Sequence, residues 1–479
     1  MSSTIALILI GVAVLFILGI KFLSSPKTAR QGNLVAAAGM LIGLVILSKP
    51  GGANIWSQGW TFNYTLIAIG IVVGLVIGAL GAYSVKMTAM PQMVALFNGL
   101  GGGAAALVAS LEFIKGASPA EMAGTMPPGD PSAAVTLPML FATLIGSLSF
   151  SGSIIAYLKL EGKFEKPMTF PGQNFLNGLI LLVILVLCGW LAFHASGGSA
   201  ITAFIVMFLL ALFFGIAMVM PIGGADMPVV ISLLNSFTGL AVAADGFAIN
   251  NTAMIVAGTL VGSSGTLLTL LMCKAMNRPV TNVLFGAFGT GGGGKAGASG
   301  VAGTVKPIQA DEAAVLLAYA QRVVVVPGYG MAVAQAQHQV RELSEELGKR
   351  GVEVQFAIHP VAGRMPGHMN VLLAEANVPY DQLIEMEQIN PSMDRVDVCL
   401  VIGANDVVNP AAREDKGSPI YGMPIIDADR CKCTIVMKRS MAAGFAGIEN
   451  HLFYKDNTRM LFGDAKASLN ALVAAVKAS

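Results

Sequence analysis

A glycine-rich turn in the C-terminal part of the chain has residue types and spacing that could bind a ligand. Arg322–Val326 is a β-branched run typical of a buried strand, and Pro327-Gly-Tyr-Gly-Met-Ala-Val333 follows it directly. Gly328 permits a sharp turn, Gly330 lets the backbone approach a pyrophosphate, and a helix starting there offers unpaired N–H groups to the negative charge. Because Val333 stands where a third glycine is usual, the motif predicts a dinucleotide site only within a βαβ unit.

The segments after this turn supply that unit. The amphipathic stretch Met331–Lys349 predicts a helix, and Val352–Ile358 predicts a second strand. The second strand runs into His359-Pro-Val-Ala-Gly-Arg364, at the place where a NAD site usually keeps an acidic residue for the ribose 2′-hydroxyl. An arginine near that position favours NADP(H) over NAD(H).

Polar and basic residues follow two further predicted strands. Val396–Ile402 runs into Gly403-Ala-Asn-Asp406, and Thr434–Met437 runs into Lys438-Arg-Ser440. The carboxyl ends of parallel strands lie at one edge of a sheet, where ligands bind. Arginine can bind a phosphate bidentately and lysine adds a point charge, so this edge suits the 2′-phosphate of NADP(H). The alternative for these two cations is a solvated basic pair.

A second glycine-rich stretch precedes this predicted domain. Gly289-Thr-Gly-Gly-Gly-Gly294-Lys295 approaches a phosphate-binding loop, but Ala296 stands where that loop needs Ser or Thr, and no strand precedes it. We therefore predict a flexible linker over residues 286–309. Residues 310–479, which begin with a helix-like segment at 310–320, are predicted to form a cytoplasmic α/β Rossmann-like domain with a parallel sheet.

The charged residues are divided unevenly between these parts. Residues 1–285 carry 18 of the Lys, Arg, Asp and Glu side chains with a net charge of +4, and the remaining residues carry 38 with a net charge of −2. Neither part has the dense basic face that nucleic-acid binding needs. The five cysteines show no zinc spacing and no disulfide framework, so no metal is predicted and the soluble part is expected in a reducing compartment.

Residues 1–285 are predicted to form an all-α transmembrane helix bundle, because their apolar stretches are long enough to cross a hydrocarbon layer. We predict about nine spans: Ile5–Leu23, Leu34–Leu47, Leu66–Tyr83, Met93–Phe113, Val135–Tyr157, Leu176–Phe193, Ile201–Met220, Met227–Ala244 and Met254–Met276. The first is expected to be a retained span, not a signal peptide. The opposite set of loops holds only Lys49 and Lys115, whereas one set holds nine cations: Lys21, Lys27, Arg30, Lys86, Lys159, Lys163, Lys166, Lys274 and Arg278. This bias predicts an N-terminus outside and a cytoplasmic C-terminal domain, which an odd number of spans allows.

The predicted spans are rich in small residues and poor in polar ones. Runs such as Gly101–Gly103 are expected to let helices pack closely. Asn98 and Asn235 fall inside spans, where each suits an interhelical hydrogen bond or a functional role. Asp226 precedes the eighth span, where it either has a functional role or caps the helix that begins at Met227.

Several long motifs, taken together and in order, resemble the β subunit family of proton-translocating NAD(P) transhydrogenase, and the resemblance covers essentially the whole chain. The motifs are Pro327–Gln337, His359–Asn370, Gly403–Ala411, Lys438–Ser440 and Phe462–Ala467. The resemblance implies a membrane domain joined to an NADP(H)-binding domain. It also implies an α subunit, of one chain or two, that binds NAD(H) and carries the remaining membrane helices.

The resemblance further implies that hydride passes directly between the two nicotinamides while protons return from outside to the cytoplasm. No side chain is assigned as a catalytic acid or base, because hydride transfer is chemistry of the cofactors. Besides Gly328, Gly330 and Val333 of the glycine turn, the residues expected around NADP(H) are Tyr329, Val361, Ala362, Gly363, Arg364, Met365, Pro366, Gly403, Ala404, Asn405, Asp406, Val407, Gly422, Met423, Lys438, Arg439, Ser440, Met441, Ala442, Ala443, Gly444, Phe445, Asp464 and Ala465. The proton path is expected to use Asn98, Asn235 and Asp226. A bacterial plasma membrane, surrounding lipid and a dimer of protomers complete the expectation.

Two positions depart from the family pattern. Asn98 stands where many relatives have a membrane histidine, and an amide does not titrate near neutral pH, so the proton carrier is left open. Phe445 stands where relatives often have a tyrosine over the nucleotide. Asp406 is either a conformational switch or an ordinary hydrogen-bonding loop residue. A rival function is a channel or transporter whose NADP(H) domain only senses redox state.

Overall fold

The computed structural model describes residues 3–23, 28–47, 62–117, 133–164, 168–194, 197–223, 226–277, 279–281, 304–363, 367–418, 420–444 and 446–478. The chain divides into two compact units, Met1–Thr269 and Leu270–Ser479. Most of the predicted linker, together with the glycine run around Gly291–Gly294, lies outside the described residues.

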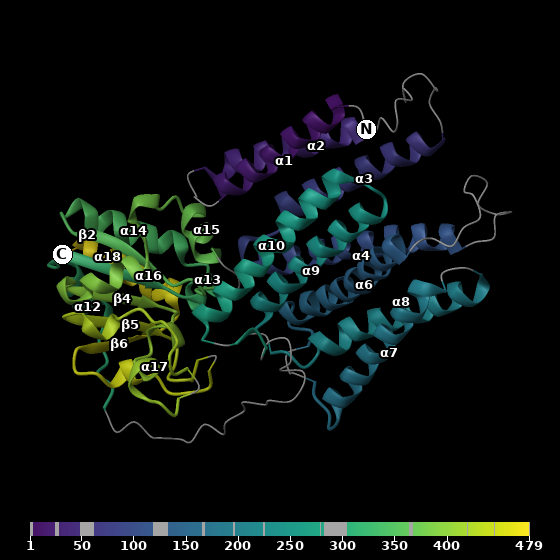
Figure 1. Ribbon diagram of the computed structural model, residues 1–479. Coiled ribbons are helices and arrows are strands. Elements are labelled where there is room, and N and C mark those ends of the chain that lie inside the picture. The colour runs from purple at the N-terminus through teal and green to yellow at the C-terminus, as the bar shows by residue number, and fades with distance from the viewer. Residues whose placement is uncertain are drawn as a thin grey trace. The chain divides into compact units, whose positions relative to one another are not determined.

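The first unit is built from long helices at all nine segments predicted to span (Figure 1). They are α1 (Ser3–Leu23), α2 (Ala29–Leu47), α3 (Phe62–Ser84), α4 (Met90–Ala117), α6 (Ala133–Leu160), α7 (Gln173–Phe193), α8 (Gly198–Val219), α9 (Met227–Ala248) and α10 (Thr252–Ala275), whose last turns belong to the second unit. Among the described residues, the seven helices from α3 to α10 are long and apolar enough to cross a membrane. The chain is therefore a membrane protein.

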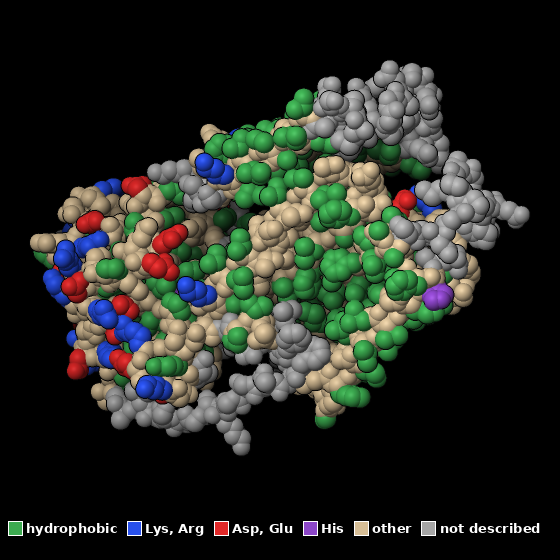
Figure 2. All heavy atoms as spheres, in the orientation of Figure 1, with side chains coloured by type: hydrophobic (Ala, Val, Ile, Leu, Met, Phe, Trp, Pro, Cys, Tyr) green, Lys and Arg blue, Asp and Glu red, His purple; other side chains and the backbone are tan. Residues whose placement is uncertain are grey.

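The outer surface of this unit is apolar. The spanning window of α3 buries none of its residues inside the unit, and Leu66, Ile67 and Leu75 are among its exposed side chains. Figure 2 shows hydrophobic side chains over the helical part and mixed charges over the other part. Because an exposed apolar helix is stable only in an apolar solvent, this surface fits contact with lipid.

Close helix packing explains the small residues, as predicted. α4, α6 and α9 lie side by side (Figure 1). A Cβ atom on Gly146 of α6 would lie 2.7 Å from the carbonyl oxygen of Gly102 on α4, so only glycine allows the two backbones to approach this far. The same feature joins α9 to α10, where a Cβ on Gly239 would lie 2.4 Å from the backbone nitrogen of Gly262.

The second unit contains a six-stranded parallel sheet. Its strands are β1 (Arg322–Pro327), β2 (Glu353–Ile358), β3 (Leu383–Glu385), β4 (Val398–Ile402), β5 (Cys433–Lys438) and β6 (Thr458–Phe462). They pair in the order β3-β2-β1-β4-β5-β6, and every pair is parallel. The four predicted strands are confirmed, while β3 and β6 were not predicted.

Helices and short 3-10 turns cover both faces of this sheet. On one face α12 (Ala310–Ala318), α14 (Gln337–Lys349) and α18 (Ala465–Ala478) pack against one another and on the strands. On the other face α16 (Met386–Ile389) and the 3-10 turns 390–395, 428–430 and 451–454 enclose an apolar cluster. Its sheet side includes Val324, Val401 and Val436, all fully buried. The carboxyl edge of the sheet is thereby held as one rigid row of strand ends.

The helix expected over Met331–Lys349 is wrong in one respect, because the structure breaks it in two. A short helix, α13 (Tyr329–Val333), ends before α14 begins, and Gln335 between them adopts a left-handed conformation with φ 50°. The backbone N–H of Ala336 donates to the carbonyl of Met331, which closes α13 in the manner of a left-handed C-terminal cap. Ala336 is fully buried at this corner, so tertiary packing overrides the local helix preference.

Candidate functional site

The turns that follow β1 and β4 touch each other with no side chain between them. A Cβ on Gly328 would lie 2.4 Å from the Cα and nitrogen of Ala404, and a Cβ on Gly403 would lie 2.4 Å from the nitrogen of Met331. The Gly328 N–H donates to the Ile402 carbonyl at 2.8 Å, and the Gly330 N–H donates to the Gly403 carbonyl at 2.9 Å. The glycines therefore join the two turns where chain connections diverge, between β1 and β4.

The turn after β4 is connected to the loop after β5. The terminal amide of Asn405 lies 2.7 Å from the backbone nitrogen of Gly444, and Asp406 Oδ2 accepts from the Ala446 N–H at 2.9 Å. A Cβ on Gly444 would lie 2.5 Å from the side chains of Asn405 and Asp406, so a larger residue here would force these two side chains to move. Asn450 adds a further bond from its amide to the Asn405 carbonyl at 2.9 Å.

The two cations at the end of β5 have different surroundings. Lys438 is half-buried, donates from Nζ to the Ala442 carbonyl at 2.5 Å and lies 4.6 Å from the centre of the Phe453 ring. Burial lowers the pKa of Lys438, and the nearby Asp406 carboxylate opposes that shift. Arg439 is exposed and makes no hydrogen bond or ion pair with any residue that the structure describes.

The end of β2 is anchored by a buried histidine. His359 Nε2 lies 2.9 Å from the Pro424 carbonyl, and Nδ1 accepts from the Val361 N–H at 3.2 Å. This pair of contacts requires the neutral imidazole with its proton on Nε2. Burial lowers the pKa of His359, while the Pro424 carbonyl acts in the opposite direction. The contact brings the segment with Gly422 and Met423 to the end of β2.

The remaining predicted cofactor residues fall into three groups. Tyr329 begins α13, whereas Val333 at the end of α13 is 52% exposed. Asp464 Oδ1 accepts from the Lys466 and Ala467 N–H groups, so this carboxylate caps α18, which begins at Ala465. A third group contains the other loop positions, which lie beside those already described: Ala362, Gly363, Val407, Ser440, Met441, Ala442 and Ala443. Arg364, Met365, Pro366 and Phe445 lie outside the described residues.

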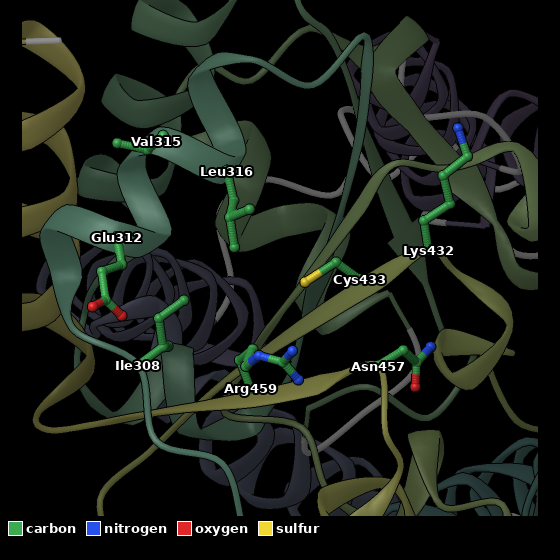
Figure 3. Close-up of a pocket in the computed structure, with 8 residues that line it drawn as sticks. All are labelled: Ile308, Glu312, Val315, Leu316, Lys432, Cys433, Asn457 and Arg459. Carbon is green, nitrogen blue, oxygen red and sulfur yellow. The ribbon is translucent and has the colours of Figure 1, made fainter.

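A pocket of about 580 Å³ lies at the other edge of the sheet. Figure 3 shows it between the α12 side chains Glu312 and Leu316 and the first residues of β5 and β6, including Cys433 and Arg459. These positions are at the amino ends of the strands. No predicted site residue lines this pocket, so it is separate from the candidate nucleotide site.

A polar chain links three helices of the first unit. Asn98 on α4 donates from Nδ2 to Ser153 Oγ at 3.0 Å and to Ser149 Oγ at 3.4 Å, both on α6. Ser149 Oγ also lies 2.6 Å from Thr238 Oγ1 on α9 and donates to the Leu234 carbonyl at 2.9 Å. Asn98 thus makes the interhelical hydrogen bonds expected of a buried amide.

The other two predicted proton-path residues are not part of this chain of contacts. The Asn235 side chain is half-buried on α9 and makes no hydrogen bond with the described residues. Asp226 is the residue before α9, but its side chain makes no capping hydrogen bond there. The capping role offered for Asp226 is therefore wrong in this structure.

Two ionisable side chains in the helical unit were missed or misplaced by the sequence reasoning. Asp245 was left outside the eighth span, yet α9 continues to Ala248 and the Asp245 side chain is 1% exposed. Lys159 was counted as a loop cation, yet it is buried in the last turn of α6, where Nζ donates to the carbonyls of Val219 at 3.2 Å and Ile222 at 2.7 Å. A lone acid one residue past an apolar run was the signal for Asp245.

Comparison with known proteins agrees with the motifs in the sequence. Residues 5–475 match the family described as NAD(P) transhydrogenase beta subunit. Two curated proteins from Rhodospirillum rubrum, the second from a specified strain, are both named NAD(P) transhydrogenase subunit beta. Each is 48% identical to this chain over 478 residues, covering 99% of both chains. The chain therefore belongs to the NAD(P) transhydrogenase beta subunit family.

Proposed function

We propose that this chain binds NADP(H) at the carboxyl edge of its sheet and exchanges hydride with NAD(H) held by an α subunit, while protons pass through its helical unit. The observation that carries the proposal is the bare glycine contact between the β1 and β4 turns. In a doubly wound sheet of order 3-2-1-4-5-6, dinucleotides bind at the point where the strand order reverses, which is between β1 and β4. The same order supports a Rossmann-like fold for the domain.

The choice of NADP(H) over NAD(H) is supported by the groups at two strand ends. β2 ends at the buried neutral His359, without a carboxylate to bind a ribose 2′-hydroxyl. Arg439 at the end of β5 is exposed and suits a phosphate dianion. If Arg439 binds the 2′-phosphate, the adenosine half of the cofactor lies toward β5, on the other side of β1 from β2.

The protein's part in the reaction is to hold and enclose the nucleotide. NADP(H) supplies the hydride chemistry when bound. The backbone of the β1 and β4 turns would contact the pyrophosphate. The 438–444 loop would enclose the nucleotide beside these turns, because the Ala446 N–H that follows it donates to Asp406. Asp406 connects the β4 turn to this loop, so a change in that contact would alter how firmly the nucleotide is held.

The membrane side of the proposal concerns span count, orientation and proton path. We propose nine spans, with residues 1–285 as the membrane domain, 286–309 as linker and 310–479 as the cytoplasmic nucleotide domain. Seven and nine spans are both odd, so either number agrees with an N-terminus outside and a cytoplasmic nucleotide domain. The membrane proposed is the bacterial plasma membrane, on the family resemblance. Asn98 is proposed for the proton path, supported by its hydrogen-bonded chain to Thr238. Asn235 and Asp226 are proposed with it on the family resemblance alone.

The first experiment tests the reaction. The chain is reconstituted in vesicles with its α partner, and NADH-driven reduction of NADP⁺ is followed together with a pH-sensitive dye. Reduction accompanied by proton movement is expected. Bound NADP(H) without any reduction would contradict the enzyme and favour a redox-sensing channel or transporter.

A second experiment tests the phosphate contact. Arg439→Ala should weaken NADP(H) binding by roughly tenfold to a hundredfold, because a charge-assisted hydrogen bond contributes about 1.5–3 kcal/mol. NAD(H) binding on the α subunit should not change. Arg395→Ala removes an exposed arginine just before β4, at the other edge of the sheet, and serves as the matched control. Equal NADP(H) affinity in the Arg439→Ala and parent proteins would remove the assignment.

A further inference from the structure

Asp245 is a buried carboxylate in the helical unit. It lies in the last turn of α9, its side chain is 1% exposed, and both of its carboxylate oxygens are buried without a hydrogen-bond partner among the described residues. A carboxylate inside a membrane bundle is costly to ionise and is rarely kept without a function. The protonation of Asp245 is therefore expected to depend on the charges and polar groups that lie near its carboxylate.

The packing of α6 on α9 shows what lies beside Asp245. Ser149 meets Thr238, while Ala142, earlier on α6, shares a buried cluster with Ala244, later on α9, so the two helices run antiparallel. Asp245 is next to Ala244 and so lies at the level of Ala142. No ionisable side chain of α6 lies near that level.

The packing of α4 on α9 places two charges beyond Asp245. Ala109 of α4 shares the buried cluster with Ala244 of α9. Gly101, about two turns earlier on α4, lies against Thr238, nearly two turns earlier on α9. The two helices therefore run parallel. Glu112 and Lys115, which pair at 2.9 Å, therefore lie about half a turn and about one and a half turns past Asp245, toward the ends of both helices. Glu112 is 28% exposed at its side chain, so this end of the bundle opens to the surroundings.

The other ionisable groups of the packed helices are far from Asp245. Lys159 is the second-last residue of α6 and lies at the opposite end of the bundle. α10 runs antiparallel to α9, with Ile255 against Gly246, which places Lys274 at that opposite end as well. Within the described part of α4, α6, α9 and α10, Glu112 and Lys115 are thus the charged neighbours of Asp245.

A polar chain begins on the inner side of Asp245. Thr238 lies seven residues earlier on α9 and hence on the same face, about 10 Å along the axis. Thr238 is 2.6 Å from Ser149, which in turn is 3.4 Å from the amide of Asn98. The order along the bundle is therefore a partly exposed acid (Glu112), a buried acid (Asp245) and a hydrogen-bonded chain of neutral polar groups.

We propose that Asp245 is a proton-binding site through which protons from outside reach the polar chain of Thr238, Ser149 and Asn98. The proposal rests on the proposed function, which places this end of α9 outside. An O–H bond forms when the Asp245 carboxylate takes a proton from outside water, and it breaks when that proton passes to a water or hydroxyl on the Thr238 side. Each hydroxyl that accepts a proton donates its own onward, so the chain gains and loses equal numbers. Asp245 supplies the titratable group that Asn98 lacks.

The test uses the full chain with its α partner in vesicles. Asp245→Asn keeps the shape and removes the titration, so coupled NADP⁺ reduction and proton movement should both fall roughly tenfold or more. NADP(H) affinity should stay unchanged. Asp245→Glu should restore both rates, and the rate of the parent should show a titration with pH that Asp245→Asn loses. Asn177→Leu is the control, because Asn177 of α7 is also buried with an amide that has no partner among the described residues, yet cannot titrate.

The contrary outcomes are separable. Parent-like rates and pH profile in Asp245→Asn would overturn the proposal, and so would equal losses in Asp245→Asn and Asp245→Glu, because those would show a packing role. Failure of the proposed function is seen elsewhere, in a parent complex that transfers hydride with no proton movement.

Discussion

Gly328→Ala tests whether the β1–β4 contact governs nucleotide binding. The added methyl would lie 2.4 Å from the Cα and nitrogen of Ala404 and from the carbonyl oxygen of Gly403, whereas ordinary contacts begin at 3.4 Å. The obstructing atoms are backbone, so one turn must move by about 1 Å. Overpacking of this kind costs about 3 kcal/mol or more. If the moving turn is the one that faces the cofactor, NADP(H) affinity falls roughly a hundredfold, at tenfold per 1.4 kcal/mol.

The assay is titration of NADP(H) into the purified complex, with thermal unfolding measured in parallel. Gly348→Ala is the matched control, because Gly348 is exposed in α14 and an added Cβ meets nothing within 4 Å. Alanine should stabilise that helix by about 0.5 kcal/mol and leave NADP(H) binding alone. If Gly328→Ala leaves both the NADP(H) affinity and the midpoint temperature of thermal unfolding unchanged, the reasoning about this contact is refuted.

Three further predictions concern groups with defined partners. Arg413→Ala should destabilise the domain by about 2 kcal/mol near neutral pH, because it leaves the buried Asp427 carboxylate without the guanidinium that now lies 2.6 Å away. Burial already raises the pKa of Asp427, so the loss should shrink in acid, as thermal unfolding against pH would show. Burial lowers the pKa of His359, so the folded protein keeps this imidazole neutral while the unfolded chain takes up a proton below the ordinary value of about 6.5. Folding stability, and with it NADP(H) retention, should therefore fall as pH drops below that value, and His359→Asn should flatten that dependence. Ser149→Ala should slow proton movement in vesicles without changing NADP(H) affinity, because it removes the bridge between α4 and α9.

Each of these has an outcome that would contradict it. A loss of stability in Arg413→Ala that is equal at all pH values would exclude the Asp427 explanation. Parallel pH curves for His359→Asn and the parent would show that another group titrates. Normal proton movement in Ser149→Ala would remove this serine from the proton path.

The helices and central strands were predictable because their residues satisfy local rules. Apolar runs of sufficient length gave all nine helices, and β-branched runs gave the four central strands. β3 was missed because it is only three residues long, and β6 because Thr458–Phe462 contains an arginine in its second position. The helix predicted over Met331–Lys349 is interrupted at Gln335 because of packing at a buried corner. The sequence there contains no glycine or proline that would have indicated the interruption.

The chemistry of the site was less predictable than its location. The glycine turn and the Lys438-Arg439 pair identify strand ends, but not that Lys438 turns back to the Ala442 carbonyl while Arg439 stays exposed. The contact of His359 with Pro424 joins residues 65 positions apart, and that of Ser149 with Thr238 spans 89 positions. Such pairings depend on tertiary packing, which a pattern of residue types does not encode.

The buried Lys159 has a consequence for how the helical unit is assembled. Its ammonium binds the carbonyls at the end of α8, around Val219 and Ile222, about 60 residues later in the chain. A lysine inside a bilayer is costly, so until α8 has been synthesised this side chain must reach toward headgroups and water. This contact therefore forms only once α8 has joined the bundle beside α6.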